Sequence, residues 1–173
     1  MDIETTGMCR GGNGGDICGG HRIIEIGCVE IIDQLRIGGF FQVYINPHRT
    51  IDPKATAIHG ISDYFLRDKP SFEHIVKDLI AFIGNSELII HNAKFDIAFL
   101  EKEFSLLPKS KQPKGKDFKV LDTLILARRI FPFQRNDLNT LQSRFNIDIE
   151  RKTHGALLDA NILARVYMAL IAH

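Results

Sequence analysis

The period of apolar residues changes along the chain, and each change predicts a different element of structure. Between residues 21 and 32, β-branched residues alternate with smaller or polar ones, which predicts a strand. Residues 40–46 continue as its hairpin partner, which Pro47 ends. Beyond it, a helix is predicted that Ser71 caps and that Gly84 and Asn85 stop. Its apolar residues recur at helical spacing: Phe72, Ile75, Val76, Leu79, Ile80 and Ile83.

The rest of the chain alternates between short apolar runs and helical patterns. Short helical turns are predicted within 53–66, and strands at 87–91 and near 118–121. Helices are predicted at about 94–107, 122–131, 136–145 and 155–171. No internal repeat is present. Strands followed by alternating helices and strands predict a mixed sheet with helices on both faces.

Two acidic residues, Asp2 and Glu4, lie at the start of the chain with Ile3 between them. In an extended strand, side chains alternate between faces, so these two carboxylates project from one side, roughly 6–7 Å apart along the backbone. This spacing suits a divalent cation that keeps several water ligands. Two solvated acids at a frayed terminus are the alternative if no later segment supplies further ligands.

Two later segments supply such groups. Asp96 begins a helical pattern after a short apolar strand, and Asp159 begins the last helix. Residues five apart in a helix lie about 140° from each other, so His154 and Asp159 converge only if His154 precedes the helix. Gly155 provides the hinge for that arrangement. One histidine beside four acids from three segments is typical of a carboxylate metal site with a general base.

These motifs together resemble the DEDD superfamily of 3′→5′ exonucleases, in the subclass whose last motif carries histidine. The alternative subclass places a tyrosine four residues before the last aspartate, where this chain has Gly155. Within the superfamily, the chain is most similar to the proofreading epsilon subunits of bacterial DNA polymerase III. The resemblance covers nearly the whole chain and rests on 2–7, 22–27, 58–61, 91–96 and 154–160.

The resemblance implies a ribonuclease H-like α/β fold, with a mixed five-stranded sheet flanked by helices. It also implies that residues 1–173 form a single exonuclease domain. In the family the first aspartate ends a full central strand, whereas here only Met1 precedes Asp2. We therefore expect a truncated first strand, either because the chain begins late or because the protein tolerates a damaged sheet. Each unpaired buried ladder group would cost about 1–3 kcal/mol.

The resemblance also implies a reaction and its cofactors. Asp2, Glu4 and Asp159 would bind two divalent cations, with Asp2 bridging, and Asp96 would bind directly or through water. Magnesium or manganese suits oxygen ligands better than zinc does. One ion would lower the pKa of the attacking water, and the other would stabilise the leaving 3′ oxygen. His154 would be the catalytic base that takes the proton from that water.

Further residues are implied in binding the terminal nucleotide. Thr5 and Thr6 would offer backbone N–H groups, and His59 and Ile61 would line the base pocket. Asn92 would position the 3′ end, and the metal-binding Asp2, Glu4 and Asp159 would also touch substrate. A packed core role remains the alternative for His59. Relatives commonly have glutamate where this chain has Lys54, so the contact to the terminal sugar is in doubt.

The function implied is removal of terminal nucleotides from DNA, as proofreading during replication. An RNA-trimming exonuclease with the same residues and a non-catalytic, nuclease-like scaffold are the alternatives. The partners implied are a single-stranded or frayed 3′ end, the catalytic subunit of DNA polymerase III and a small accessory subunit. The polymerase-binding tail of the family would follow His173, so these residues alone support no contact with the polymerase.

Composition limits the remaining possibilities. At 173 residues and 45% hydrophobic, the chain suits one globular domain. It has no apolar run of the roughly 18–20 residues that span a membrane, and no signal peptide pattern. Three cysteines fit a reduced, cytoplasmic protein. The net charge of +1 argues against tight binding to long nucleic acid. The basic residues from 109 onward have two interpretations, a solvated loop or a flank that guides a DNA strand.

Two features have competing structural and functional interpretations. The glycine-rich segment 9–21 lacks a P-loop ending, and zinc binding by Cys9, Cys18 and His21 is disfavoured by their spacing. A mobile loop beside the active site is the expectation there. Phe131, Phe133 and Phe145 are expected in the core, rather than as platforms for base stacking.

Overall fold

The first three strands form an antiparallel sheet that carries the start of the chain. A computed structural model describes residues 1–7, 18–113 and 118–173. In it, β1 (Asp2–Thr5) pairs with β2 (Ile23–Ile32), which pairs with β3 (Arg36–Tyr44). The register places Asp2 opposite Gly27 and Glu4 opposite Glu25, with a bulge between Glu4 and Thr5.

The remaining two described strands, β4 (Leu88–Ile90) and β5 (Val120–Asp122), form a separate parallel ladder. The predicted count of five strands is therefore confirmed, but the predicted single sheet is divided into two ladders. The link between them is the Met1 ammonium group, which donates to the Ile89 carbonyl at 2.8 Å. The physical reason is that β1 pairs only with the first part of β2, from Ile23 to Gly27, and does not extend between the far end of β2 and β4.

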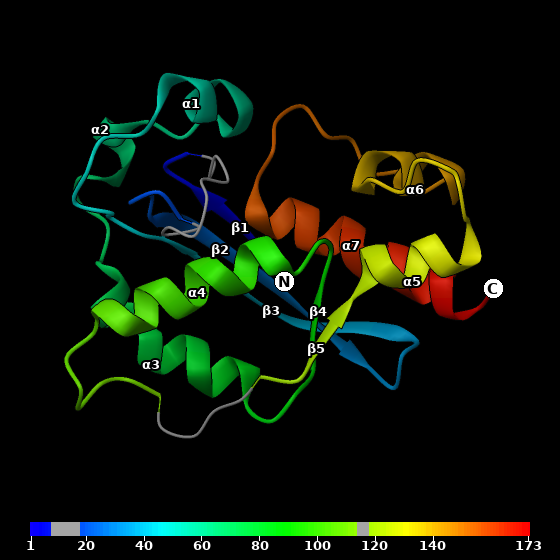
Figure 1. Cartoon of the computed structure of the whole chain (residues 1–173), viewed down its shortest axis with the longest axis horizontal. Helices are drawn as coiled ribbons and strands as arrows, with labels where there is room; N and C mark the ends of the chain where they lie inside the picture. Colours follow the sequence, from blue (N-terminus) through cyan, green and yellow to red (C-terminus); the bar gives the residue numbers. More distant parts are fainter. Residues whose placement is uncertain (8–17, 114–117) are drawn as a thin grey trace.

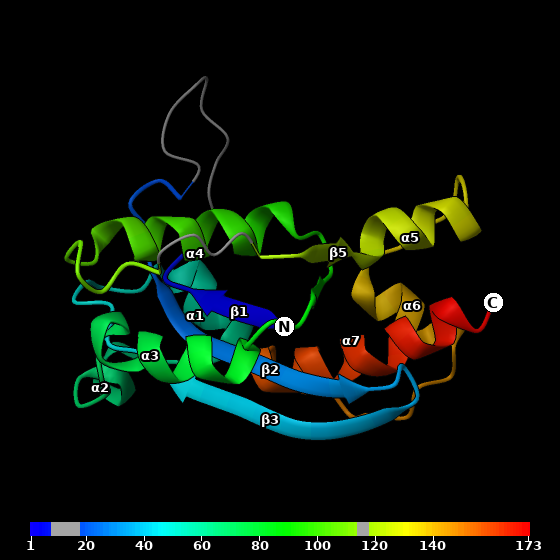
Figure 2. The ribbon, with the colours of Figure 1, turned by 90° about the horizontal axis from the view of Figure 1, so that it is seen from below.

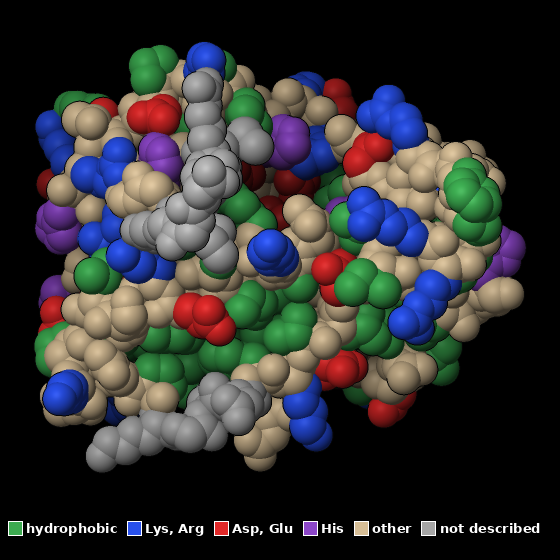
Figure 3. All heavy atoms as spheres, viewed as in Figure 1, with side chains coloured by type: hydrophobic (Ala, Val, Ile, Leu, Met, Phe, Trp, Pro, Cys, Tyr) green, Lys and Arg blue, Asp and Glu red, His purple; other side chains and the backbone are tan. Residues whose placement is uncertain are grey.

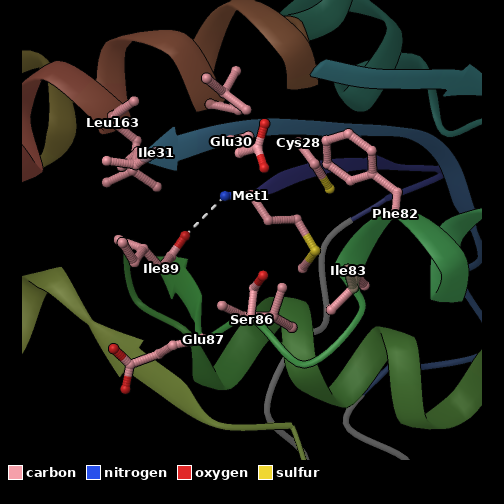
Figure 4. A pocket seen from close by; sticks show the side chains of 14 residues that line it. Met1, Cys28, Glu30, Ile31, Phe82, Ile83, Ser86, Glu87, Ile89 and Leu163 are labelled. Carbon is pink, nitrogen blue, oxygen red and sulfur yellow. Dashed lines mark hydrogen bonds between the residues drawn. The ribbon is translucent and has the colours of Figure 1, made fainter. Parts of the chain in front are cut away.

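A cavity of about 130 Å³ occupies this gap (Figure 4). Met1 lies at one end, with β2 residues Cys28 and Ile31 on one side and Ile89 of β4 on another. Phe82 of α3 (Phe72–Ile83) and Leu163 of α7 (Ala156–Ile171) also line it. The cavity thus lies between β2 and β4, next to the first residue of the chain.

Seven helices surround the strands in the described part of the chain (Figure 1). They are α1 (Pro53–His59), α2 (Asp63–Leu66), α3 (Phe72–Ile83), α4 (Lys94–Leu106), α5 (Thr123–Ile130), α6 (Leu138–Arg144) and α7 (Ala156–Ile171). They begin and end within a few residues of the sequence predictions. No helix among the described residues is both long and apolar enough to span a membrane.

The strands of the first sheet have α3 and α4 on one side and α7 on the other (Figure 1), and β2 and β3 run side by side along one edge of the view in Figure 2. Ile26 and Cys28 point into the main core cluster, where α3 and α4 contribute residues such as Leu79 and Phe99. The intervening Gly27 faces the first turn of α7 instead. A second apolar cluster joins α5, α6 and α7 around Leu141 and the buried side of α7. The period-2 pattern of β2 therefore separates two helical layers, and α7 lies against the acidic face of β1.

The structure tests the predictions for the three phenylalanines, and part of those for the glycine-rich and basic segments. Phe131 and Phe145 pack in the α5–α7 cluster with ring centroids 6.0 Å apart, as predicted. The prediction for Phe133 is wrong, because its side chain is fully exposed at 109% in the turn after α5. The prediction of a mobile glycine-rich loop concerns residues that lie largely outside the described ranges. Cys9, one of the three residues considered for zinc binding, also lies outside them. Lys114 and Lys116 of the basic segment also lie outside them, while Lys111 pairs with Glu73 at 2.8 Å.

Candidate active site

β1 presents two acids on one face, as its alternating sequence predicts. Ile3 and Thr5 are buried at 6% and 7% exposure, while Asp2 and Glu4 are half-buried on the opposite face. Pairing with β2 fixes this orientation because a shift by one residue would exchange the two faces. The strand therefore directs both carboxylates toward the side on which α7 lies.

The start of α4 is held by an acid outside the predicted set. The carboxylate of Asp122, at the end of β5, accepts the backbone N–H groups of Asn92 at 3.1 Å and Ala93 at 3.0 Å. It also caps α5 through the N–H of Leu124 at 2.8 Å. Asn92 takes a left-handed conformation with φ 65°, which turns the chain from β4 into α4. This turn brings Asp96 to the site in a buried position, at 4% exposure.

The start of α7 is fixed against β2 by a glycine and a buried acid. A Cβ atom on Gly27 would lie 2.2 Å from the backbone of Ala156, so only glycine permits this approach. The carboxylate of Glu25, 1% exposed, accepts the N–H of Ala156 at 3.1 Å. Gly155 is the extended N-cap residue, and His154 precedes the helix. His154 and Asp159 consequently meet, with Nδ1 and Oδ2 3.3 Å apart, as predicted from their spacing.

These segments meet at one cleft of about 360 Å³. Figure 3 shows acidic side chains inside a hollow on this face, with basic and histidine side chains near its rim. All five predicted catalytic and metal-binding residues line the cleft. The described lining consists of Asp2, Ile3, Glu4, His91, Asn92, Phe95, Asp96, Asp137, Leu138, Asn139, Arg151, His154 and Asp159.

The clustered acids raise one another's proton affinity. Burial and the charges of Asp96 and Asp159 raise the pKa of Asp2 well above its usual value. Burial, followed by the charges of Asp159 and Glu25, raises the pKa of Glu4 from 4.5 to about 8. Burial likewise raises the pKa of Asp96 to about 7. Burial also raises the pKa of Asp159, although Arg151 and His154 oppose this. The cleft therefore concentrates negative charge at a high free-energy cost.

The donor atoms in the cleft fit a divalent cation. Asp96 Oδ1 and Asp159 Oδ1 are buried and have no hydrogen-bond partner among the described residues. One ligand atom each of Glu4, His154 and Asp159 lies within 4.8 Å of the others. Carboxylate oxygens without partners in a cluster of acids are the ligands that Mg²⁺ and Mn²⁺ prefer. A cation would satisfy these oxygens and offset the repulsion that raises the pKa values.

Arg151 is a residue of this cleft that the motifs did not indicate. Its guanidinium group contacts Asp159 Oδ2, His154 Nδ1 and Asn139 Oδ1. The sequence placed Arg151 only in the general run of basic residues. No periodicity or motif distinguishes it from the exposed Lys152, because the loop path that brings Arg151 inward is a tertiary feature.

The residues predicted to bind the nucleotide lie around the β1 end of the site. His59 is 6% exposed, with Nδ1 accepting the Ile61 N–H at 3.0 Å and Nε2 without a partner in the described chain. Ile61 is 8% exposed and packs in the cluster that surrounds α1. Thr6 donates its backbone N–H to the Arg22 carbonyl at 2.9 Å, so this amide is already engaged. Lys54 is exposed on α1.

The remaining predicted contacts border the same region. Thr5 is buried, and its hydroxyl donates to the Gly7 carbonyl at 2.7 Å. Asn92 is exposed at the rim of the acidic cleft. The backbone N–H of His154 contacts the Ile58 carbonyl at 3.3 Å, which joins the loop before α7 to the segment that carries His59. A pocket for the terminal nucleotide at this junction stays a prediction.

Fold and site together define the class of protein. Solved structures with the same fold include exonuclease X in complex with 5′-overhanging duplex DNA, at a TM-score of 0.69 and 27% identity, covering 99% of this chain and 89% of that one. The nuclease domain of 3′hExo, a DEDDh family member bound to rAMP, gives a TM-score of 0.72 at 19% identity, with coverage of 99% and 89%. The ribonuclease H-like fold is thereby confirmed. The class is that of the DEDDh exonucleases, which use divalent metal ions.

The family follows from the sequence comparisons. The family model described as Exonuclease matches residues 1–167. DNA polymerase III subunit epsilon of Salmonella typhimurium (strain LT2) is 51% identical over 172 residues, covering 98% of this chain and 69% of that protein. The epsilon subunit of Escherichia coli (strain K12) is 49% identical with the same coverage, and that of Rickettsia prowazekii (strain Madrid E) is 46% identical, covering 98% and 72%. The chain belongs to the exonuclease family of DNA polymerase III epsilon subunits and is a 3′→5′ exonuclease.

Proposed function

We propose that residues 1–173 act as a single exonuclease domain that removes nucleotides from the 3′ end of DNA and proofreads newly replicated strands. The observation that supports this most strongly is the convergence of Asp2, Glu4, Asp96, Asp159 and His154 on one cleft. The identity of about half to the epsilon subunits, over nearly the whole chain, favours DNA as the polymer.

The four acids would hold two divalent cations, Mg²⁺ or Mn²⁺. Bound cations of this kind lower the pKa of a nucleophilic water and stabilise the charge on the leaving oxygen. Asp2 and Glu4 approach from β1, and Asp96 and Asp159 from two helices, so the ligand set surrounds the cleft from three segments. The partnerless oxygens of Asp96 and Asp159 are available as ligands without the loss of an existing hydrogen bond.

His154 would accept the proton from the attacking water. Partial burial and the neighbouring Arg151 charge lower the pKa of His154, so its imidazole is neutral and able to accept a proton at neutral pH. Its side chain is 44% exposed at the cleft, which gives water access to the ring. The extended Gly155 allows the ring to face Asp159 without belonging to the helix.

The terminal nucleotide would lie between the acids and the α1 segment. His59 and Ile61 would line the base, Thr5 and Thr6 would border it from β1, and Asn92 would border the 3′ end. Burial lowers the pKa of His59, so its ring is neutral beside a base at physiological pH. The Thr6 amide is engaged with Arg22, so Thr6 would contribute through packing unless that bond opens.

The partners proposed are the catalytic subunit of DNA polymerase III and a small accessory subunit. The named relatives, of whose length this chain matches 69%, are subunits of that polymerase, which supports the catalytic subunit as a partner. The accessory subunit is proposed from the family resemblance alone. Co-purification of the chain with each purified partner would test these contacts independently of nuclease activity.

The test of the function is hydrolysis of matched single-stranded DNA and RNA oligonucleotides, labelled at the 5′ end, with Mn²⁺ or with EDTA. Faster shortening of DNA from its 3′ end, lost in EDTA, is expected. Asp2→Asn and Asp159→Asn should each reduce turnover at least about 100-fold, while Asp68→Asn, an exposed control at 81% side-chain exposure, should not. Full activity of Asp2→Asn would overturn the proposed site, and faster hydrolysis of RNA would overturn the proposed substrate.

A further inference from the structure

Arg151 reaches into the acidic cleft from the loop between α6 and α7. Its side chain is only 11% exposed, whereas that of the neighbouring Lys152 is 80% exposed. Among the described residues that line the cleft, Arg151 is the only lysine or arginine. An arginine with so little exposure requires partners, because its guanidinium group remains charged at any physiological pH.

The partners of Arg151 are the same groups that the nuclease site requires. Its Nη2 contacts Asp159 Oδ2 and lies 2.6 Å from His154 Nδ1, and its Nη1 contacts Asn139 Oδ1. Asp159 is therefore held through Oδ2, while Oδ1 has no partner. The guanidinium group thus joins a proposed metal ligand to the proposed base.

This contact encloses one ring nitrogen of the imidazole. His154 Nδ1 lies 2.6 Å from Arg151 Nη2 and 3.3 Å from Asp159 Oδ2. Arg151 therefore competes with any other group that would approach His154 Nδ1 or Asp159 Oδ2.

A cation that binds Asp159 meets the charge of Arg151. The candidate ligand atoms of Glu4, His154 and Asp159 lie within 4.8 Å of one another, and Arg151 contacts two of these three residues. Two positive charges at such a distance repel each other strongly in a partly buried site. The metal ion and the guanidinium group therefore favour different arrangements of the same two side chains.

We propose that Arg151 is an internal counter-cation that holds Asp159 and His154 while the metal site is empty and yields them when a divalent cation binds. Arg151 is a positioning residue in this scheme and does not act on the reacting atoms. The proposal rests on the proposed function, because it requires a metal site at Asp159. It predicts that the protein weakens its own metal affinity in exchange for an ordered, stable metal-free cleft.

The test compares Arg151→Gln with Lys152→Gln, which removes the same charge from the adjacent exposed position. Mn²⁺ affinity is measured by calorimetry, and thermal unfolding is followed in EDTA, so that neither readout requires activity. Arg151→Gln should bind Mn²⁺ about tenfold more tightly than wild type, which corresponds to about 1.4 kcal/mol. Its metal-free melting temperature should fall by about 4 °C or more, since Asp159 loses its partner. Lys152→Gln should change neither quantity.

Equal or weaker Mn²⁺ affinity in Arg151→Gln would overturn the proposal. Arg151→Lys serves as a second variant if Arg151→Gln fails to fold. It keeps the charge but cannot contact three partners at once, so it should lose thermal stability while its Mn²⁺ affinity stays within about threefold of wild type. Tenfold tighter binding by Arg151→Lys would also contradict the role of charge. Absence of Mn²⁺ binding by wild type would instead refute the proposed function. The calorimetric titration of wild type gives that result separately from the comparison of the variants.

Discussion

Glu4 offers a direct measure of the repulsion inside the acidic cleft. It faces Glu25 across the β1–β2 ladder and lies beside Asp159, and its pKa is raised from 4.5 to about 8. We predict that Glu4→Gln stabilises the metal-free protein at alkaline pH, although it removes a proposed metal ligand. The amide has nearly the same size, and no charge remains to repel the neighbouring acids.

The magnitude follows from the proton affinity. The interval between 4.5 and about 8 corresponds to about 5 kcal/mol at about 1.36 kcal/mol per pH unit. Water and rearrangement of the half-buried side chain screen part of this repulsion, so we expect a gain of about 2 kcal/mol. For a chain of this length, this gain raises the melting temperature by about 4–8 °C.

The sign of the pH dependence is specific. Glu4 binds a proton more tightly in the folded protein than in the unfolded chain, so its contribution to stability decreases as the pH rises from 4.5 to about 8. The stabilisation by Glu4→Gln should therefore be nearly absent at about pH 5 and complete above about pH 8. Differential scanning calorimetry in EDTA at these two pH values measures it.

The control is Glu101→Gln, which removes an exposed carboxylate from α4 outside the cleft. It should change the melting temperature by less than about 1 °C at either pH. A loss of stability in Glu4→Gln at pH 8, or the same gain at both pH values, would show that Glu4 is not strained by its neighbours. Saturating Mn²⁺ should stabilise wild type more than Glu4→Gln, because the cation already relieves the repulsion in wild type.

Two further predictions concern the packing that supports the site. Gly27→Ala should destabilise the protein by about 2–4 kcal/mol in denaturant unfolding, because its Cβ would lie 2.2 Å from the backbone of α7, whereas Gly39→Ala, whose nearest neighbour would be 3.7 Å away, should be nearly neutral. Equal effects of these two substitutions would contradict the close approach of α7. Extension of Met1 by four β-forming apolar residues should raise the melting temperature by about 4 °C or more over a Gly-Ser extension of equal length, because strand residues would fill the cavity between β2 and β4. Identical melting temperatures for the two extensions would show that the gap does not accept a strand.

Local pattern was sufficient for much of the fold and for the character of the site. The alternation of Asp2, Ile3 and Glu4 determined that two acids share a face, since strand side chains alternate by covalent geometry. The five-residue spacing of His154 and Asp159 required a helix start between them, which Gly155 provides. Helix boundaries followed from apolar spacing and stop residues, because these are properties of neighbouring residues.

Only the tertiary structure decided what depends on contacts between distant segments. Phe133 is exposed although its apolar side chain suggested a core residue, because the turn after α5 directs it outward. The side chain of Arg151 is 11% exposed and that of Lys152 is 80% exposed, a difference set by the path of one loop over the cleft. The raised pKa values of Glu4 and Asp96 exist only because β1, α4 and α7 bring their charges together in a place with little water. Sequence determined which groups are available, and the packing of α7 on Gly27 determined that they meet.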